Sequence, residues 1–445
     1  MRRLATTVLA LALAAAAALP ATAATAGPDS AGPDHRGKGR GPSHDRPLPH
    51  ASAAQLTGWS VLPTETYVPG SEPSGRWVTG NAAVPAPFKG QPVQGFSATH
   101  RSTDGSYLVM SDNGFGTKAN SADALLAVHR IKPDTRTGRT RYLGTPMQLS
   151  DPGRLVPWPI WRDGACLAAT SLPQGYTCPT PDRRLTGWDF DPESMQIAPD
   201  GTFWFGDEFG PYLLHTDARG RLLQAPIPTP GVKSPSNPTL KPGEAPQVPD
   251  SKGYEGMAIS PDGLTLYPLL EGATAEDKAA GHPEDLRIHT VRLGGRAGAR
   301  YTGEVVRYRM EDKAHAIGDF AMINDHQGMV IERDGGAGPT AQVKRVYLVD
   351  LRDRDNDGYV EKHLLVDLMD LANPRQLGGA GDPFTFPFVT IEDVEILDAR
   401  TIAVMNDNNF PGTGGRSATQ PDRNEYLEIR LGGRLDVDKR LLPTR

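Results

Sequence analysis

Short runs of alternating apolar and polar residues recur along most of this chain, and side chains that carry oxygen bound each of them. In one copy, Glu193 opens an apolar stretch, Pro-Asp-Gly follows, and a second apolar run ends at Asp207 and Glu208. Alternation with a period of two, interrupted by Pro-Asp-Gly, predicts a β-hairpin. The oxygen-bearing side chains stand where the first strand begins and where its partner ends.

Similar hairpins are predicted at residues 94–113, 255–271, 319–334 and 392–409. No long stretch shows helical periodicity, and 49 Gly and 41 Pro favour turns, so we predict an all-β chain. Hairpins that repeat around one axis form a β-propeller. The shortest intervals between the starts of successive hairpins have the length of one four-stranded blade. The first interval, from 94 to 193, is longer and holds an extra blade or a long insertion. We predict a single propeller of six blades, with five or seven left open.

The N-terminus has the features of an export signal. Arg2 and Arg3 precede an apolar run, and small residues up to Ala26 offer cleavage sites, which predicts a signal peptide over 1–26 and a secreted, extracellular protein. That run is shorter than the roughly 20 residues of a membrane span, so we expect no membrane association. Residues 27–54 are nearly free of apolar side chains and predict a disordered leader. The propeller is assigned to 55–445.

Net charge and cysteine content indicate which partners and which covalent cross-link to expect. A net charge of -6 without a basic stripe argues against nucleic acid as a partner. In an exported protein, Cys166 and Cys178 predict a disulfide that closes a surface loop. We expect a monomer whose partner is a small-molecule ester or phosphorylated substrate.

The oxygen-rich clusters are the candidate chemistry, because the sequence has no Gly-x-Ser-x-Gly elbow, His-Glu-x-x-His motif, P-loop or Rossmann fingerprint. Calcium takes six to eight oxygen ligands, and residues delivered from several blades suit that shell. Turns alone account for Asp200 and Asp262, which stand in Pro-Asp-Gly. The predicted calcium ligands are Asp112, Asn113, Glu193, Asp207, Glu208, Glu255, Glu332, Asp393, Asp407 and Asn408.

Catalysis is assigned to the carboxylates nearest the clear hairpin anchors. These residues are Glu193, Asp207, Glu208 and Glu255. Lys252 and Arg333 lie beside acidic anchors and are predicted to bind an anionic substrate such as a phosphate, with ordinary ion pairing as the alternative.

A second calcium candidate is the loop that contains Asp353, Asp355 and Asp357 before a glycine. This spacing imitates the start of an EF-hand loop, but Leu364 stands where the bidentate glutamate belongs. A polar hairpin loop is the alternative interpretation.

Five strings in consistent order resemble the bacterial phytase-like family, also described as esterase-like proteins of the phytase family. They begin at Trp188, Gly206, Lys252, Val330 and Ile391, and the resemblance extends from about Gly95 to Phe410. The resemblance implies a secreted β-propeller with activity on phosphate esters. Propeller phytases use several calcium ions to bind phosphates and to position an attacking water, although their detailed motifs do not align here residue by residue.

Two classes of function follow from this sequence. The first is a calcium-dependent hydrolase, with phosphate esters as the leading substrates and a lactone or carboxylic ester as the alternative. The second is a non-catalytic propeller in which calcium only stabilises a binding module, because fold alone does not establish catalysis.

Overall fold

The computed structural model describes residues 48–80, 83–163, 183–294 and 298–442. The predicted signal peptide, most of the predicted leader, and both Cys166 and Cys178 lie outside these residues. The end of the predicted leader is ordered, because Ala51–Ala53 form the 3-10 helix η1 and Ala54 is buried. No helix within the described ranges has the length and apolarity needed to cross a membrane.

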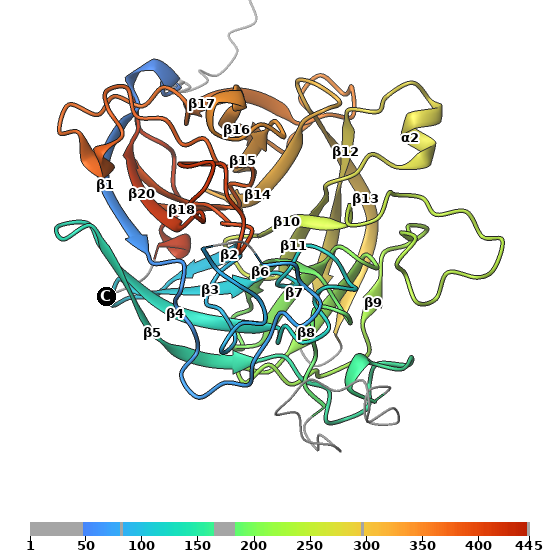
Figure 1. Ribbon diagram of the computed structural model, residues 1–445. Coiled ribbons are helices and arrows are strands. Elements are labelled where there is room, and N and C mark those ends of the chain that lie inside the picture. Colours follow the sequence, from blue (N-terminus) through green and yellow to red (C-terminus); the bar gives the residue numbers. More distant parts are fainter. Residues whose placement is uncertain (1–47, 81–82, 164–182, 295–297, 443–445) are drawn as a thin grey trace, which may run out of the picture. The chain divides into compact units, whose positions relative to one another are not determined.

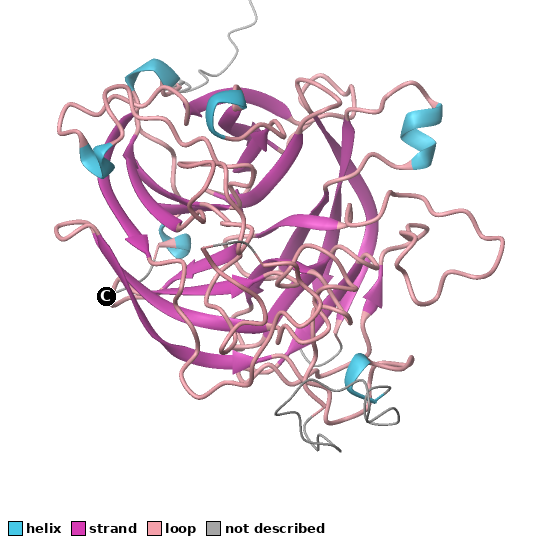
Figure 2. Cartoon of the chain, in the orientation of Figure 1, coloured by secondary structure: helices cyan, strands magenta, loops and turns pink. Residues whose placement is uncertain are grey.

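Strands dominate the described residues, and only short helices interrupt them (Figure 2). The first two sheets each contain four antiparallel strands in chain order. The first consists of β2 (Phe96–Arg101), β3 (Tyr107–Ser111), β4 (Ala127–Asp134) and β5 (Arg139–Gln148). The second consists of β6 (Pro192–Ile197), β7 (Phe203–Asp207), β8 (Tyr212–Thr216) and β9 (Ile227–Pro228).

The third and fourth sheets repeat this arrangement. The third consists of β10 (Tyr254–Ile259), β11 (Thr265–Leu270), β12 (Asp285–Leu293) and β13 (Ala299–Arg309). The fourth consists of β14 (Ala316–Met322), β15 (Gln327–Arg333), β16 (Lys344–Asp350) and β17 (Glu361–Asp367). The remaining short helices are α2 (Ala275–Ala279), η4 (Gly338–Thr340), η5 (Leu377–Gly379) and η6 (Lys439–Leu441).

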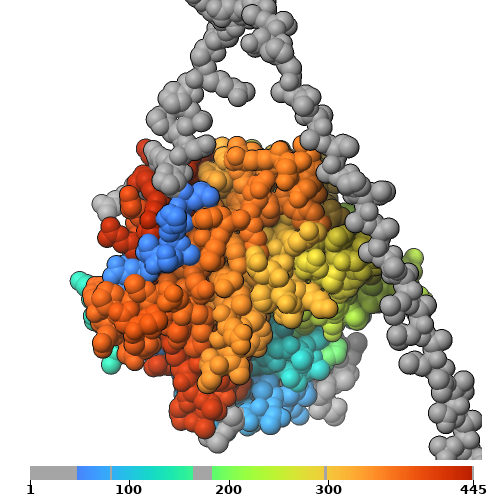
Figure 3. Space-filling model, turned by 90° about the horizontal axis from the view of Figure 1, so that it is seen from above, coloured from blue at the N-terminus to red at the C-terminus, as the bar shows by residue number. Residues whose placement is uncertain are grey.

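The fifth sheet joins the two ends of the propeller domain. It consists of β18 (Asp393–Asp398), β19 (Thr401–Met405) and β20 (Asn424–Arg430), followed by β1 (Gln55–Leu62) as its outermost strand. β1 pairs antiparallel with β20 from Gln55 to Leu62, so the first strand of the domain completes the last sheet. In Figure 3 the blue N-terminal segment lies between orange and red C-terminal surfaces. One parallel bridge from Val61 to Arg139 also links β1 to the first sheet.

The first strands of the five sheets stand in a ring. β2 contacts β6, β6 contacts β10, β10 contacts β14, β14 contacts β18, and β18 returns to β2 (Figure 1). The all-β propeller prediction is therefore confirmed, but the preferred count of six is replaced by five within the described residues. The long interval from Gln94 to Glu193 holds the four strands of the first sheet and then a connection between β5 and β6, and the described residues of this connection add no further blade strand.

Apolar side chains of neighbouring sheets form five buried clusters, one at each junction of the ring. Between the fourth and fifth sheets the cluster contains Met329, Val346, Val394 and Ile402. The other four clusters join the remaining neighbouring pairs. Side chains alternate between the two faces of a strand, so each sheet packs on both neighbours at once. This packing explains why a short strand such as β7 is buried at every position.

The sheets approach closely near the axis at Gly318 of β14. A Cβ atom added there would lie 1.9 Å from the carbonyl oxygen of Ile391, which is backbone and has little freedom to move. Glycine at this position therefore allows the fourth and fifth sheets to meet.

We expect Gly318→Ala to lower the free energy of unfolding by about 1–3 kcal/mol or more, because the new methyl overpacks a backbone contact. Gly335→Ala is the matched control, since no atom lies within 4 Å of the added Cβ. Thermal and denaturant unfolding of both variants measure the difference. Equal stability of the two variants would show that the close approach at Gly318 is unimportant.

Candidate metal centre

A shift in strand pairing marks the start of the first strand of most of the sheets. In β2, β6 and β10 the pairing register with the next strand shifts around the second residue, which is Ser97, Glu193 or Glu255, and in β14 it shifts around the third residue, Gly318. A β-bulge of this kind adds one residue to a strand and re-aims its side chain. Glu392 takes the corresponding place before β18: its N–H donates to the Met405 carbonyl at 3.3 Å, and Met405 is also the pairing partner of Asp393.

A second set of charged side chains comes from the ends of the neighbouring strands β3, β7, β11, β15 and β19. These residues are Asp112, Glu208, Glu271, Arg333 and Asp407. Each sheet thus contributes one position from a bulge and one from a strand end. The fourth sheet departs from the acidic pattern, because its two positions are Gly318 and Arg333.

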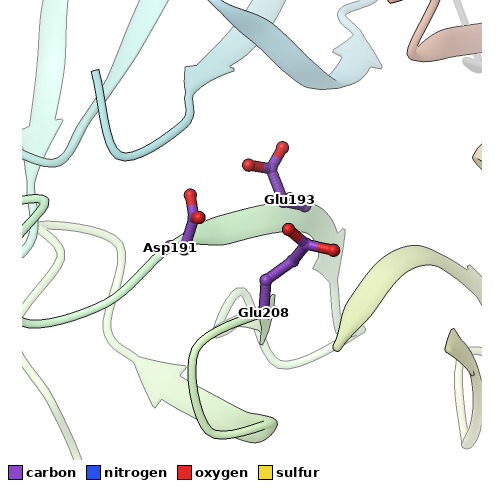
Figure 4. A group of neighbouring side chains, drawn as sticks. All are labelled: Asp191, Glu193 and Glu208. Carbon is purple, nitrogen blue, oxygen red and sulfur yellow. The ribbon is translucent and has the colours of Figure 1, made fainter. Parts of the chain in front are cut away.

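Two groups of three carboxylates result from this arrangement. Asp191, Glu193 and Glu208 each offer an oxygen within 4.8 Å of the others, and so do Glu208, Glu255 and Glu271. In Figure 4 the carboxylates of Asp191 and Glu193, from the start of β6, face that of Glu208, from the end of β7. Glu208 belongs to both groups, so the two groups form one continuous acidic centre.

The carboxylates of this centre are shielded from solvent and incompletely paired. Glu208, Glu255 and Glu271 are 5%, 4% and 4% exposed. Oε1 of each has no hydrogen-bond partner among the described residues. Burying an ionised carboxylate is costly unless a partner compensates it, and a bound cation is one such partner. The unpaired oxygens therefore fit a centre built to hold a cation.

Burial and mutual repulsion raise the pKa values across the centre. Burial raises the pKa of Glu193 well above its ordinary value, and the charges of Asp191 and Glu255 add to the effect. The pKa of Glu208 is raised by burial and then by Glu271 and Glu255. At the other side of the ring, burial raises the pKa of Asp407 to about 6. Without a cation, these groups keep their protons to a higher pH than ordinary carboxyl groups do.

Two cations lie beside the carboxylates, and both are already engaged. The Arg333 guanidinium lies 3.6 Å from Glu255, 3.7 Å from Glu271 and 3.5 Å from Glu392. Lys252 forms an ion pair with Glu271, and its side chain is 41% exposed. Burial opposes the charge on each, but the surrounding carboxylates raise the pKa of both above the ordinary value. Arg333 is an internal counter-ion, while Lys252 reaches solvent.

Two of the predicted ligands hold the centre in place through hydrogen bonds. Asp207 accepts hydrogen bonds from the backbone N–H groups of Asp191 at 2.8 Å and Gly210 at 2.7 Å. Asn113 donates its side-chain amide to Asp191 at 2.8 Å, and its backbone N–H donates to the same carboxylate at 3.1 Å. Both residues orient Asp191, which the sequence reasoning did not select.

Glu332 and Asn408 lie in other environments. Glu332 accepts hydrogen bonds from the Tyr308 hydroxyl at 2.6 Å and from Lys362 at 2.7 Å, and it also pairs with His315. These partners lower its pKa despite burial. Asn408 accepts from the Gly95 N–H at 3.2 Å and donates to a backbone carbonyl. Neither belongs to the two carboxylate groups.

Glu392, and not the predicted ligand Asp393, lies beside Arg333 of the centre. Glu392 is the residue that reaches Arg333 and Ser97, whose hydroxyl donates to it at 3.1 Å. Asp393 is fully buried in a separate acidic cluster with Asp319 and Glu395. Adjacent strand residues point to opposite faces, so only one of the two can face the axis. Aligning Glu392 with Glu193 and Glu255 as the bulged position identifies it, and Glu271 is found in the same way as the partner of Glu208.

The aspartate loop between β16 and β17 is a hydrogen-bonded turn with neighbouring carboxylates. Asp353 accepts from the N–H groups of Asp357 at 2.9 Å and Gly358 at 2.8 Å. Oxygens of Asp353, Asp355 and Asp357 lie within 4.8 Å of one another at the surface. The geometry of this loop thus agrees with a polar hairpin turn. Calcium binding by its aspartates stays a prediction.

Comparison with known proteins identifies the family. Residues 91–410 match the phytase-like family, described as esterase-like activity of phytase. The chain belongs to the phytase-like family. The resemblance from about Gly95 to Phe410 is thereby confirmed, and membership supports a hydrolase-type propeller.

One curated relative has a similar segment. An uncharacterized secreted protein of Arthroderma benhamiae is 36% identical over 105 residues. The match spans 20% of this phytase-like chain and 20% of that relative. The relative's name links the segment to a secreted protein.

Similar solved structures are remote in sequence. An aldose sugar dehydrogenase of Streptomyces coelicolor, bound to PQQ, is 12% identical with a TM-score of 0.35, covering 86% of this chain and all (100%) of its own. The calcium-binding protein regucalcin of Agrobacterium tumefaciens is 12% identical with a TM-score of 0.30, covering 88% and 98%. A gluconolactonase of Xanthomonas campestris is 15% identical with a TM-score of 0.24, covering 75% and 71%. The propeller assignment rests on the ring formed by the first strands of the five sheets, not on these neighbours.

The stability of the chelated protein should fall as pH rises. Asp and Glu titrate near pH 4 in an unfolded chain, whereas burial raises the pKa of Asp207 to about 7 and that of Asp407 to about 6. Between these values the folded state binds more protons than the unfolded state, so the free energy of unfolding falls from about pH 4 to about pH 7. Calcium should reduce this decline by replacing the protons.

Thermal unfolding at pH 5 and pH 8, in chelator and in excess calcium, measures this effect. We expect the lower melting temperature at pH 8 in chelator only. A decline of the same size with calcium present would contradict cation binding by the raised-pKa carboxylates.

Proposed function

We propose that this phytase-like propeller is a calcium-dependent ester hydrolase that acts on phosphate esters. The observation that carries the proposal is the pair of carboxylate groups that share Glu208. Two cations side by side are a common arrangement for displacement at phosphorus, where they stabilise both the attacking and the leaving oxygen. Family membership agrees with ester hydrolysis.

The donor set fits calcium. Both groups consist of carboxylates alone, with no histidine or cysteine, and hard cations prefer such oxygen ligands. Asp191, Glu193, Glu208, Glu255 and Glu271 would hold the ions. Calcium bound there would neutralise the phosphoryl oxygens and lower the pKa of a bound water.

The chain's own residues would bind and orient the reactants. Glu193, Glu208 and Glu255 are the predicted catalytic carboxylates that lie in the groups, and Glu193 or Glu208 could accept a proton from an attacking water. Glu255 lies 3.6 Å from Arg333, which balances its charge. Asp207 is a positioning residue, because it accepts hydrogen bonds from two backbone N–H groups, those of Asp191 and Gly210.

Lys252 and Arg333 have different roles in this proposal. Lys252 is partly exposed beside Glu271, so its ammonium can contact a substrate anion. Arg333 is surrounded by three glutamates and keeps them together. Its removal would leave buried charges without compensation.

A carboxylic ester or lactone is the second candidate. One pocket is lined by one charged residue, Asp112 of the ring, and otherwise by apolar, hydroxyl, amide and glycine positions. Such a lining suits a neutral ester. A binding module without catalysis would use the same cations for stability only.

Location and assembly complete the proposal. We propose that the protein is exported, since an apolar N-terminal run follows Arg2 and Arg3 and the relative from Arthroderma benhamiae is named as secreted. We also propose a monomer without nucleic-acid or membrane partners.

Glu208→Gln should weaken calcium binding and turnover together. The variant removes a charge shared by both groups, and we expect a loss of at least about 100-fold, the upper cost of losing an outer-shell partner. Calorimetric calcium titration and hydrolysis of a phosphate monoester measure the two losses. Asp262→Asn, in an exposed hairpin turn, is the control and should change neither. Full activity in Glu208→Gln would contradict the site assignment.

Substitution of the two cations should separate binding from stability. Arg333→Gln breaks a buried charge network and should lower the free energy of unfolding by about 3–5 kcal/mol. Lys252→Gln should change stability by less than about 1 kcal/mol, because its side chain is partly exposed, while raising KM for phosphate esters. Unfolding curves and steady-state kinetics provide both quantities. Unchanged KM in Lys252→Gln would remove this residue from substrate binding.

A further inference from the structure

A pocket of about 350 Å³ includes Asp112, a strand-end carboxylate of the ring whose pKa is raised in part by the charge of Asp191 in the acidic centre. This volume lies in the range of small-molecule sites. The other residues that line it are Val78, Thr79, Gly114, Phe115, Gly116, Asn409, Phe410, Pro411, Gly412 and Thr413. Residues 114–116 and 409–413 form most of this pocket lining. The first segment follows Asp112 and the second follows Asp407, and both aspartates are carboxylates of the ring.

Hydrogen bonds connect these two segments to the ring. The Gly114 N–H donates to Asp112 at 2.9 Å, and the Asn409 N–H donates to Asp407 at 2.7 Å. Asn409 has a left-handed backbone with φ 45, a conformation that asparagine tolerates better than most residues. The segments that line the pocket are therefore hydrogen-bonded to two strand-end carboxylates of the ring, Asp112 and Asp407.

Aromatic side chains form a packed wall behind the pocket. The rings of Phe88 and Phe410 have centroids 4.8 Å apart, and those of Phe88 and Phe115 are 5.4 Å apart. Tyr67 packs edge-on against Phe410. These residues belong to one buried apolar cluster with Val84 and Ala124 packed into it. Phe115 and Phe410 thus present apolar surface to the pocket from a supported position.

Positive charge is absent from the described lining of this pocket. Asp112 is the one charged residue among the lining positions, and burial raises its pKa well above the ordinary value, with Asp407 and Asp191 adding to the effect. Two lysines lie on nearby aromatic rings: Lys89 over Tyr67, and Lys118 over Trp188 and Phe209. Neither lysine lines the pocket. A second anionic group on a substrate would find no cationic partner there.

We propose that this pocket takes an uncharged aryl or alkyl group of the substrate, so that the protein cleaves monoesters of apolar alcohols rather than polyphosphorylated compounds. The inference rests on the proposed function for the bond that is cleaved. Water forms a new bond to phosphorus, and the bond from phosphorus to the alkoxy oxygen breaks. One proton of the water ends on the departing alcohol, and the products are the free alcohol and inorganic phosphate.

The substrate series 1-naphthyl phosphate, methyl phosphate and inositol hexakisphosphate tests this inference on the full-length mature protein with calcium. We expect kcat/KM for 1-naphthyl phosphate to exceed that for inositol hexakisphosphate by at least about tenfold. Preference for inositol hexakisphosphate would overturn the inference while supporting phosphate ester hydrolysis.

Thr413→Trp fills the pocket from an exposed lining position without removing a core side chain. We expect it to lower kcat/KM for 1-naphthyl phosphate by at least about tenfold and for methyl phosphate by less than about twofold. Thr419→Trp, on the same loop but outside the pocket lining, is the matched control. Equal losses for both substrates in Thr413→Trp would overturn the inference.

Binding distinguishes failure of the inference from failure of the proposed function. Calorimetric titration with 1-naphthol should show binding to the wild type and to Thr419→Trp, and at least about tenfold weaker binding to Thr413→Trp. If none of the phosphates is cleaved but this binding pattern holds, the proposed phosphatase activity fails and the apolar pocket stands. If 1-naphthol does not bind the wild type, the pocket assignment fails whatever the hydrolysis results.

Discussion

Repulsion among carboxylates at the axis constrains the central architecture of this propeller. Glu193, Glu208, Glu255 and Glu271 come from two different sheets and are buried together. Their like charges oppose assembly of the ring, while the apolar clusters between the sheets favour it. A cation or bound protons must offset the repulsion. Within the described residues, Arg333 and Lys252 form ion pairs with some of these carboxylates, and the remaining negative charge must be balanced by bound cations or protons.

The exception in the fourth sheet gives the centre its asymmetry. Gly318 and Arg333 replace the carboxylates found at corresponding positions of the second and third sheets. Arg333 forms ion pairs with Glu255 and Glu271 of the third sheet and with Glu392 before β18, so its charge is shared between the third and fifth sheets. Ser97 gives the first sheet a neutral bulge position as well. The repeated sheets therefore form the ring, and the residues that differ from the repeat determine where negative charge accumulates.

Much of the fold could be predicted because its signals are local. Alternation, Pro-Asp-Gly turns and the recurrence of Glu193 and Glu255 identify hairpins and their orientation around an axis. The blade count could not be fixed in this way, because the connection between β5 and β6 is as long as a blade and has no distinct pattern. Pairing of β1 with β20 also joins residues 55–62 to 424–430, a contact that no local pattern specifies.

The candidate site was predicted less completely, for a geometrical reason. A bulge moves one residue out of strict alternation, so whether Glu392 or Asp393 faces the axis depends on a register shift that the sequence does not display. Glu332 illustrates the same difficulty, because one position separates it from Arg333, which reaches the centre, whereas Glu332 pairs with Tyr308 and Lys362. Asp191 was missed because it precedes its strand, and its place is revealed by its hydrogen bonds with Asn113 and Asp207 and by its proximity to Glu193 and Glu208.

Pairing of β1 with β20 has a consequence for folding during synthesis. Ribosomes release the N-terminal strand first, yet its partner β20 ends at Arg430, close to the end of the chain. Until that partner emerges, the backbone hydrogen-bonding groups of β1 that β20 satisfies are unpaired, and the fifth sheet lacks its outer strand. The first strand of the domain is therefore completed by the last, and a chain shortened before β20 lacks the antiparallel partner of β1.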